Sequence, residues 1–491
     1  MMNEPWKSDK PIVLRTDSNK AGPPVAERNE GRGLAEGNLP QQNAVRTQSR
    51  GDVFNALERV RQAAGRNKDT RFTALFHYVY DRELLEWAYF QLKKEAAPGV
   101  DGETWRHYGE SLDERLHDLS QRLQRGAYRA KPVRRTYIPK ADGRQRPLGV
   151  TALEDKIVQR AAVEVMNAIY EQDFAEFSHG FRTGRSQHDA LDQLYQGIMQ
   201  RKVNWVLDLD IRAFFDSVSQ KWLVQFLEHR IGDRRVVRLI QKWLRAGVLE
   251  QGKLTVSEQG TPQGGSASPL LANVYLHYVF DLWIQAWQRK NARGDMLVVR
   301  FADDIVVGFQ EKAEAERFWL ELQERVKKFE LELHPEKTRL LEFGRFAAQN
   351  RAKRGEGKPE TFNFLGFTHI CGTTQRGRFT VLRQTIRKRM RAKLKVVRSE
   401  LRRRMHDPLE DVGRWLRAVV GGHIRYYGVP TNSAALRAFR HEVSRYWHRV
   451  MCRRSQLGKV TWTRMQRLID RWLPPARICH PYPSCRVRVT T

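Results

Sequence analysis

The sequence predicts a mixed α+β fold, and three observations support that prediction. Two short apolar runs, 297–301 and 305–309, are rich in β-branched and aromatic residues and flank a turn, which is typical of a β-hairpin. Another apolar strand, interrupted by aspartates, is predicted within 203–218. Amphipathic helical segments precede and follow these strands, and the last of them are strongly basic.

The composition indicates a polyanionic partner. The chain has 491 residues, 41% of them hydrophobic, enough for roughly two to four packed domains. Lysine and arginine number 87 against 56 acidic residues, and the net charge of +31 opposes compact folding unless a polyanion such as nucleic acid neutralises it. Basic charge alone does not choose among RNA, DNA and an anionic membrane. The sequence has no long apolar run and no signal core, so we expect neither a membrane span nor secretion.

The first half of the chain begins with a change of composition. Residues 1–52 are rich in Pro, Gly, Asn and Gln and lack apolar periodicity, which predicts a disordered leader. From 53 to 127 the pattern is helical, with a turn cluster at 97–102. A strand is predicted at 135–139, and Asp142-Gly143 indicates a hairpin turn.

Basic residues flank this predicted hairpin turn. Lys140 and Arg146 would place positive charge at its tip, where Arg can pair with the phosphate oxygens of a triphosphate. A solvated, charged turn explains these residues equally well.

The next segment combines a predicted helix start with a glycine-rich motif. Residues 151–154 form a capping-box pattern before a helix. In the motif at 177–186, Gly180 permits close backbone approach, and Arg182 and Arg185 can meet phosphates.

Paired carboxylates carry the strongest chemical signal. Asp303 and Asp304 are adjacent at the predicted hairpin turn, where their charges repel unless a cation compensates them, although an isolated pair is more often a solvated turn. The strand at 203–218 offers Asp208, Asp210 and Asp216, and alternation places the first two on one face. One of them with the hairpin pair would give three oxygen donors for Mg²⁺, and two such ions can clamp a phosphoryl transfer.

Two later segments are candidates for contact with a nucleotide or with nucleic acid. Gln263-Gly264 opens a glycine turn into a helix, where bare backbone can lie against a base pair or a phosphate. Between residues 383 and 404 the chain has eleven Lys or Arg and one acid, which predicts a phosphate-contacting helix. The stretch 434–454 mixes aromatics with arginines, which suits RNA stacking, although an aromatic stripe is more often core.

These motifs together resemble a known family. Residues 301–304, Phe-Ala-Asp-Asp, resemble the (Tyr/Phe)-x-Asp-Asp box of reverse transcriptases, and residues 210–216 resemble their first catalytic motif. The strings at 177–186 and 260–273 also match, and so does the turn at 97–102. From about residue 54 onward the chain is similar to the reverse transcriptase/maturase proteins encoded by bacterial group II introns.

The resemblance implies a domain order. It implies a right-hand polymerase, with a helical N-terminal extension and the start of the fingers at 53–127 and the reverse transcriptase fingers and palm at 128–380. A helical thumb and maturase domain X would occupy 381–491. No Cys-rich endonuclease module is recognisable after it, so we expect second-strand cleavage to be absent.

The resemblance also implies an activity and a set of residues. The activity is RNA-directed DNA synthesis from dNTPs with two Mg²⁺ ions, for which Asp210, Asp303 and Asp304 would be catalytic and would bind metal together with Ile211. The implied nucleotide-binding residues are Lys140, Arg146, Phe215 as a steric gate, Gln263, Gly264 and Lys337. The implied nucleic-acid-binding residues are Arg182, Arg185, Arg387, Arg391, Lys395, Arg453 and Arg454.

The implied partners are the intron RNA, an RNA template and a DNA primer or target. The protein would assist splicing as a maturase and support retromobility by target-primed cDNA synthesis. It would act in a bacterial cytoplasm, associated with the nucleoid through nucleic acid. The resemblance leaves open whether it forms a dimer. Two alternatives remain. One is a splicing-only RNA-binding maturase, and the other is a host-adopted reverse transcriptase acting in DNA repair or defence.

Overall fold

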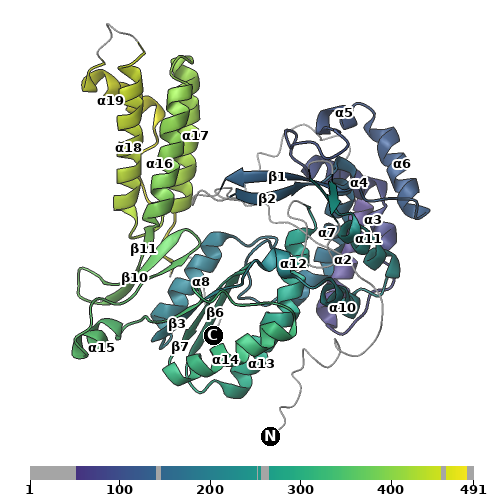
Figure 1. Ribbon diagram of the computed structural model, residues 1–491, viewed down its shortest axis with the longest axis horizontal. Coiled ribbons are helices and arrows are strands. Elements are labelled where there is room, and N and C mark those ends of the chain that lie inside the picture. The colour runs from purple at the N-terminus through teal and green to yellow at the C-terminus, as the bar shows by residue number, and fades with distance from the viewer. Residues whose placement is uncertain (1–50, 140–144, 251–252, 256–264, 455–459, 484–491) are drawn as a thin grey trace.

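The computed structural model describes residues 51–139, 145–250, 253–255, 265–454 and 460–483. Within these ranges the protein is α+β, as the sequence predicts, with helices around a central sheet and a separate set of C-terminal helices (Figure 1). The predicted leader, residues 1–52, lies almost entirely outside the described residues, since the first described helix begins at Gly51.

Short helices form the N-terminal region, as the sequence predicts. They pack around the long, largely buried helix α7, Leu153–Asp173, with α2 and α4 in direct contact with it. These N-terminal helices are α2 (Gly51–Arg66), α3 (Phe76–Val79), α4 (Arg82–Gln91), α5 (Trp105–Gly109) and α6 (Leu112–Gln124).

A small sheet with strand order β2-β1-β4-β5 follows. Strand β1, Val133–Pro139, pairs antiparallel with β2, Gln145–Val150, so the predicted hairpin is confirmed. Strand β4, Val248–Glu250, runs parallel to β1 and pairs with β5, Lys253–Thr255. The tip of the hairpin, residues 140–144, lies outside the described residues.

The central sheet holds the predicted aspartate-bearing strands. Its order is β6-β7-β3-β8, and all neighbouring strands are antiparallel. The strands are β3 (Trp205–Asp210), β6 (Met296–Phe301), β7 (Asp304–Phe309) and β8 (Arg339–Glu342). Both predicted hairpin strands are therefore confirmed.

Each face of the central sheet is covered by its own hydrophobic core. Leu207 and Leu209 belong to the main core, while Val206, one residue out of phase, belongs to a second core with α8 (Gln187–Gln200). This alternation is the period-two pattern of a strand. The main core includes α7 and the N-terminal helices as well. The other helices that contribute to it are α9 (Phe214–Ser217), α10 (Gln220–Arg230), α11 (Arg234–Arg245), α12 (Ser268–Leu276), the π-helical turn η1 (His277–Asp281), α13 (Leu282–Asn291) and α14 (Lys312–Lys328).

A three-stranded sheet, ordered β11-β10-β9, leads to the C-terminal helices. Figure 1 shows α16, α17 and α18 standing beside one another beyond β10 and β11, and they share a third core. The elements are α15 (Ala347–Lys353), β9 (Phe362–Phe364), β10 (Phe367–Thr373), β11 (Phe379–Thr385), α16 (Arg387–Arg403), α17 (Leu409–Tyr427), α18 (Ser433–Met451) and α19 (Trp462–Trp472).

The predicted capping box before α7 is wrong. The helix begins at Leu153 with Ala152 as its N-cap residue, and no side chain caps it. Thr151, which the pattern made the cap, lies one residue too early and is itself buried. The acidic residues Glu154 and Asp155 still occupy the first turn, where negative charge interacts favourably with the helix dipole and stabilises the helix.

Among the described helices, none combines the length and the apolar character needed to cross a membrane.

Candidate active site

The register of the central sheet brings the predicted carboxylates together. Asp210, the last residue of β3, pairs directly with Asp304, the first residue of β7. Side chains directly opposite in an antiparallel pair have Cβ atoms roughly 5 Å apart. Asp303 precedes Asp304 in the turn, so the three aspartates lie at the same end of the two central strands.

The turn that carries Asp303 is a tight one. Phe301 pairs with Asp304, which leaves Ala302 and Asp303 as a two-residue loop. Ala302 has a φ of 55°. A residue other than glycine in this backbone conformation is strained by about 1–3 kcal/mol. The conformation persists only when the surrounding structure holds it in place.

Gly180 packs against this turn from behind. A Cβ atom at Gly180 would lie 2.2 Å from the backbone nitrogen of Ala302, so only glycine fits without a shift. The carbonyl of Gly180 accepts a hydrogen bond of 2.6 Å from the side-chain amide of Asn273 on α12. The close backbone approach predicted for this glycine is thus made to the aspartate turn.

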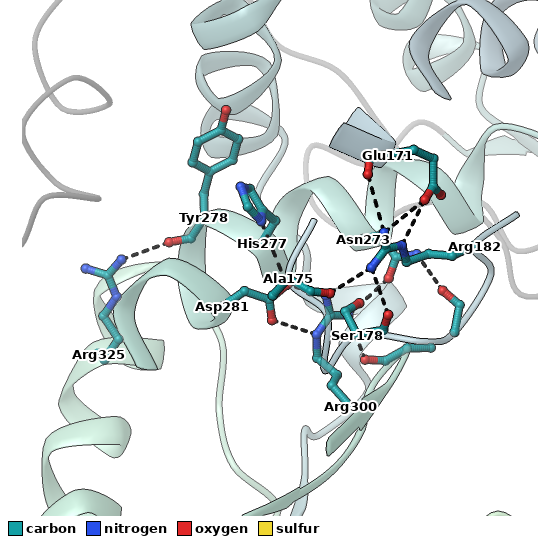
Figure 2. A network of polar contacts seen from close by, with 12 residues as sticks. Glu171, Ala175, Ser178, Arg182, Asn273, His277, Tyr278, Asp281, Arg300 and Arg325 are labelled. Atoms are coloured by element: carbon teal, nitrogen blue, oxygen red, sulfur yellow. Dashed lines mark hydrogen bonds and ion pairs between the residues drawn. The ribbon is translucent and has the colours of Figure 1, made fainter. Parts of the chain in front are cut away.

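A buried arginine ties the turn to the helices behind it (Figure 2). Arg300 on β6 is fully buried, and its Nε donates to Asp281 Oδ1 at 2.8 Å. Its Nη1 donates to Asn273 Oδ1 at 3.0 Å and to the carbonyl of Ala302 at 3.2 Å. One guanidinium therefore neutralises a buried acid and also holds the strained residue of the turn.

Neighbouring carboxylates help to raise the pKa of Asp304 and of Asp208. Asp304 keeps contact with solvent, yet desolvation and then the charge of Asp303 raise the pKa of its carboxyl to about 7, against a lowering by Arg389. Burial raises the pKa of Asp208 to about 6, with Arg339 lowering it and Asp210 raising it. A cation would relieve this crowding of negative charge.

Two basic side chains accompany the carboxylates. Lys337 Nζ lies 2.7 Å from Asp210 Oδ2, so the structure brings this predicted residue into the site. Arg339 is the partner of Asp208 in the sheet, with 3.9 Å between their charged groups.

The donor set suits a hard cation that also uses substrate oxygens. Across the part of the chain that the structure describes, no three His, Cys, Asp or Glu side chains converge closely enough to cage an ion by themselves. Mg²⁺ is bound in many sites through one or two carboxylates, while waters and substrate phosphates supply the other ligands. The opposed carboxylates of Asp210 and Asp304 fit that demand.

The predicted nucleotide-binding residues are only partly described. Phe215 lies in α9, five residues after Asp210, with its side chain in the main core and only 5% exposed. Arg146 lies in β2 opposite Ile138. Lys140, Gln263 and Gly264 lie outside the described residues.

Arg182 is placed differently from the prediction, which made it a nucleic-acid contact. Its side chain is only 3% exposed, and it forms an ion pair of 3.0 Å with Glu171 (Figure 2). It also donates to the carbonyls of Ala175 and Ser178. A buried guanidinium with its donors satisfied by protein supports the motif and does not reach a phosphate. Arg185 is half-buried.

The remaining predicted contacts lie on the C-terminal helices. Arg387, Arg391 and Lys395 are exposed and recur every four residues along α16, on one face. Arg453 and Arg454 directly follow α18.

Sequence reasoning missed the supporting network of Arg300, Asn273 and Asp281. A signal for it existed, because Arg300 stands inside an otherwise apolar strand, and a buried charge needs a partner. The partner was not predictable, since Asp281 lies in a different element.

Comparison with known proteins agrees with this geometry. Residues 138–369 match the family described as reverse transcriptase (RNA-dependent DNA polymerase). Protein YkfC of Escherichia coli is 36% identical over 217 residues, which are 42% of this chain and 57% of that protein. The group II intron-encoded protein LtrA of Lactococcus lactis is 36% identical over 225 residues, 45% of this chain and 37% of LtrA.

A eukaryotic relative has a similar identity to this chain. An uncharacterised 91 kDa protein in the cob intron of Schizosaccharomyces pombe is 37% identical over 203 residues, 41% of this chain and 24% of that protein. The matched part thus spans between 24% and 57% of the length of these curated relatives. Residues 138–369 are therefore similar to the reverse transcriptase family, and the group II intron-encoded protein LtrA is among the relatives of this region.

Proposed function

We propose that this protein is an RNA-directed DNA polymerase whose reaction takes place at Asp210, Asp303 and Asp304. The observation that carries the proposal is the direct pairing of Asp210 with Asp304, next to Asp303 in the hairpin turn. These carboxylates and the backbone of Ile211 would hold two Mg²⁺ ions, which when bound supply the charge that stabilises an in-line phosphoryl transfer.

The chain's own residues divide the remaining tasks. Lys337, 2.7 Å from Asp210, is close enough to offset negative charge that develops on a departing pyrophosphate. Lys140 and Arg146 would bind the triphosphate from the β1–β2 hairpin, and Gln263-Gly264 would contact the nucleotide and the template. Phe215 would lie beside the sugar of the incoming nucleotide and exclude a ribose 2′-hydroxyl by steric clash.

The C-terminal helices serve, in this proposal, as thumb and maturase domain X. Arg387, Arg391 and Lys395 supply one exposed basic face for nucleic acid, and Arg453 and Arg454 supply another. The similarity to LtrA, a group II intron-encoded protein, supports intron RNA as the partner, with assistance to splicing and target-primed cDNA synthesis.

The test is primer extension on an RNA template with an annealed DNA primer, dNTPs and Mg²⁺. Wild type should extend the primer, and Asp303→Ala should not. Extension that survives Asp303→Ala contradicts the catalytic assignment. Failure of wild type to extend, together with tight and salt-sensitive RNA binding, would favour the splicing-only alternative.

A further inference from the structure

A basic pocket lies between α16 and α18, away from the carboxylates. Its volume is about 410 Å³, within the range of sites for small ligands. Figure 1 shows these two helices side by side, and both belong to the third core. The residues that matter in the pocket are Arg398, Arg402 and Met405 from the α16 side and Tyr446, Arg449 and Arg453 from the α18 side.

Helical spacing directs these side chains toward one groove. Arg398 and Arg402 lie four residues apart on α16. Tyr446 and Arg449 are three residues apart on α18, and Arg453 lies just past the end of that helix at Met451. Residues at such spacings share one face of a helix, so Arg398 and Arg402 share a face of α16, and Tyr446 and Arg449 share a face of α18.

The four arginines of the pocket have no carboxylate partner among the described residues. None of them forms an ion pair with any residue in the described ranges, and all four are exposed. By contrast, Arg403 pairs with Glu400 and Arg445 pairs with Glu442, each at 2.6 Å. Four gathered and uncompensated guanidiniums repel one another, and an anionic ligand would remove that cost.

The pocket also has an apolar, aromatic side. Tyr446 and Met405 are half-buried, and Val450 beneath them is buried. The guanidinium of Arg398 lies over the ring of Tyr446, 5.9 Å from its centroid, so the aromatic ring already contacts a flat, charged group. An apolar floor with guanidiniums around it suits a ligand that has a flat ring and a phosphate.

We propose that this pocket binds one unpaired nucleotide of a single-stranded nucleic acid, with its base against Tyr446 and its flanking phosphates on the arginines. The proposal rests on the proposed nucleic-acid polymerase function and adds a second, separate subsite. Arg389, which lowers the pKa of Asp304, lies 13 residues before Arg402 on α16, a rise of about 20 Å. RNA and DNA share the recognised chemistry.

The test measures binding of a labelled 12-nucleotide RNA, and of the matching DNA, by fluorescence anisotropy at several salt concentrations. The variant Arg398→Ala/Arg402→Ala is compared with Arg403→Ala/Arg445→Ala, which removes the same charge from ion-paired positions on the same helices. The pocket variant should bind the probe more weakly. The slope of the logarithm of its binding constant against the logarithm of the salt concentration should become shallower by about 1.4, or about 0.7 for each lost phosphate contact. The control should change both quantities far less.

The aromatic contact has its own variants. Tyr446→Leu should weaken binding by about 5- to 100-fold, as loss of one stacked base does, and Tyr446→Phe should retain it. Binding of the RNA probe, of the DNA probe or of both through the wild-type pocket identifies the natural ligand. Each of these three results supports the site. Equal losses in the pocket and control variants, or no effect of Tyr446→Leu on either probe, would overturn the proposal.

Primer extension on a short primer–template separates the two proposals. All the pocket variants keep the carboxylates, so extension at saturating template should continue in each. If wild type binds the probes through the pocket but extends no primer, the proposed polymerase fails and the pocket stands. If wild type extends primers and the pocket variants bind as the control does, the pocket fails and the polymerase stands.

Discussion

At the residue scale, Arg300 has two tasks, and a double substitution can separate them. Arg300→Met alone leaves the buried Asp281 without its counter-ion, which should lower the free energy of unfolding by about 3–5 kcal/mol. Arg300→Met/Asp281→Leu replaces the pair with apolar side chains and should recover most of that loss. It does not restore the donor to Ala302, so the rate of primer extension should stay low.

Urea unfolding and single-turnover extension measure these two effects. The exposed pair Lys312–Glu316 offers the control, because Lys312→Met/Glu316→Leu should change stability by no more than about 1 kcal/mol. Normal extension by the stable double variant of Arg300 and Asp281 would show that the turn does not need this donor.

Gly180 provides a second prediction at this scale. Gly180→Ala puts a Cβ atom where the backbone of Ala302 lies, so it should destabilise the fold by about 1–3 kcal/mol and slow extension. Gly357→Ala is the matched control, because a Cβ there meets nothing within 4 Å. Thermal unfolding and the extension rate of both variants test this, and equal behaviour of the two would contradict the close packing.

Single residues also mark the limit of sequence-based prediction. Lys337 was expected to bind the nucleotide and lies beside Asp210, whereas Arg182 was expected at a phosphate and is buried against Glu171. The type of residue gives the charge of a side chain but not its burial, and burial depends on how elements far apart in sequence pack.

At the scale of elements, strand β10 makes stability depend on pH through His369. Burial, and after it the charge of Arg383, lowers the pKa of His369 to about 3 from its usual 6.5. Below pH 6.5 the unfolded imidazole takes up a proton that the folded one refuses. The free energy of unfolding should therefore fall as the pH drops from 6.5 toward 3, by about 2 kcal/mol at pH 5 from this residue.

Replacing His369 removes this dependence. The ring of His369 stacks on Phe362 with centroids 4.8 Å apart, so His369→Phe keeps a ring in place. Relative to wild type, the variant should gain stability at pH 5 and change little at pH 7.5 in urea unfolding. The exposed His406→Phe should show no such gain. Parallel pH curves for wild type and His369→Phe would refute the assignment.

The type of an element was predictable where its residue pattern was distinctive. The short apolar runs at 297–301 and 305–309, rich in β-branched and aromatic residues, predicted β6 and β7. Asp208 and Asp210 do lie on one face of β3, opposite to Leu207 and Leu209, as strand alternation predicted. The start of α7 was not predictable from its capping pattern, because Thr151 is buried and the helix begins after Ala152. Local preference yields to packing at such ends.

At the scale of the whole molecule, a net charge of +31 predicts stabilisation by polyanions. The folded chain concentrates repelling charges that RNA neutralises, so adding RNA should raise the melting temperature. The rise should shrink as salt increases from 50 to 500 mM, because screening weakens each contact. An uncharged polymer of similar size is the control, and an RNA effect that is independent of salt would argue against this electrostatic origin.

The order of the parts followed from composition and motifs, but their packing did not. The described chain has three hydrophobic cores, and two of them cover opposite faces of the central sheet. Periodicity shows that a strand has two apolar faces, but not which distant helix covers each face. The boundaries proposed at residues 128 and 381 remain predictions.

The position of β3 between β7 and β8 affects how the protein can be made. On the ribosome, the segment ending at Asp210 emerges well before the partner that begins at Asp304. At about 5–20 residues per second, synthesis of the intervening chain takes on the order of 5–20 s. Throughout that interval β3 has two open edges, which invite pairing with other chains. Slow translation across 211–303 should therefore increase aggregation of the nascent protein and its dependence on chaperones.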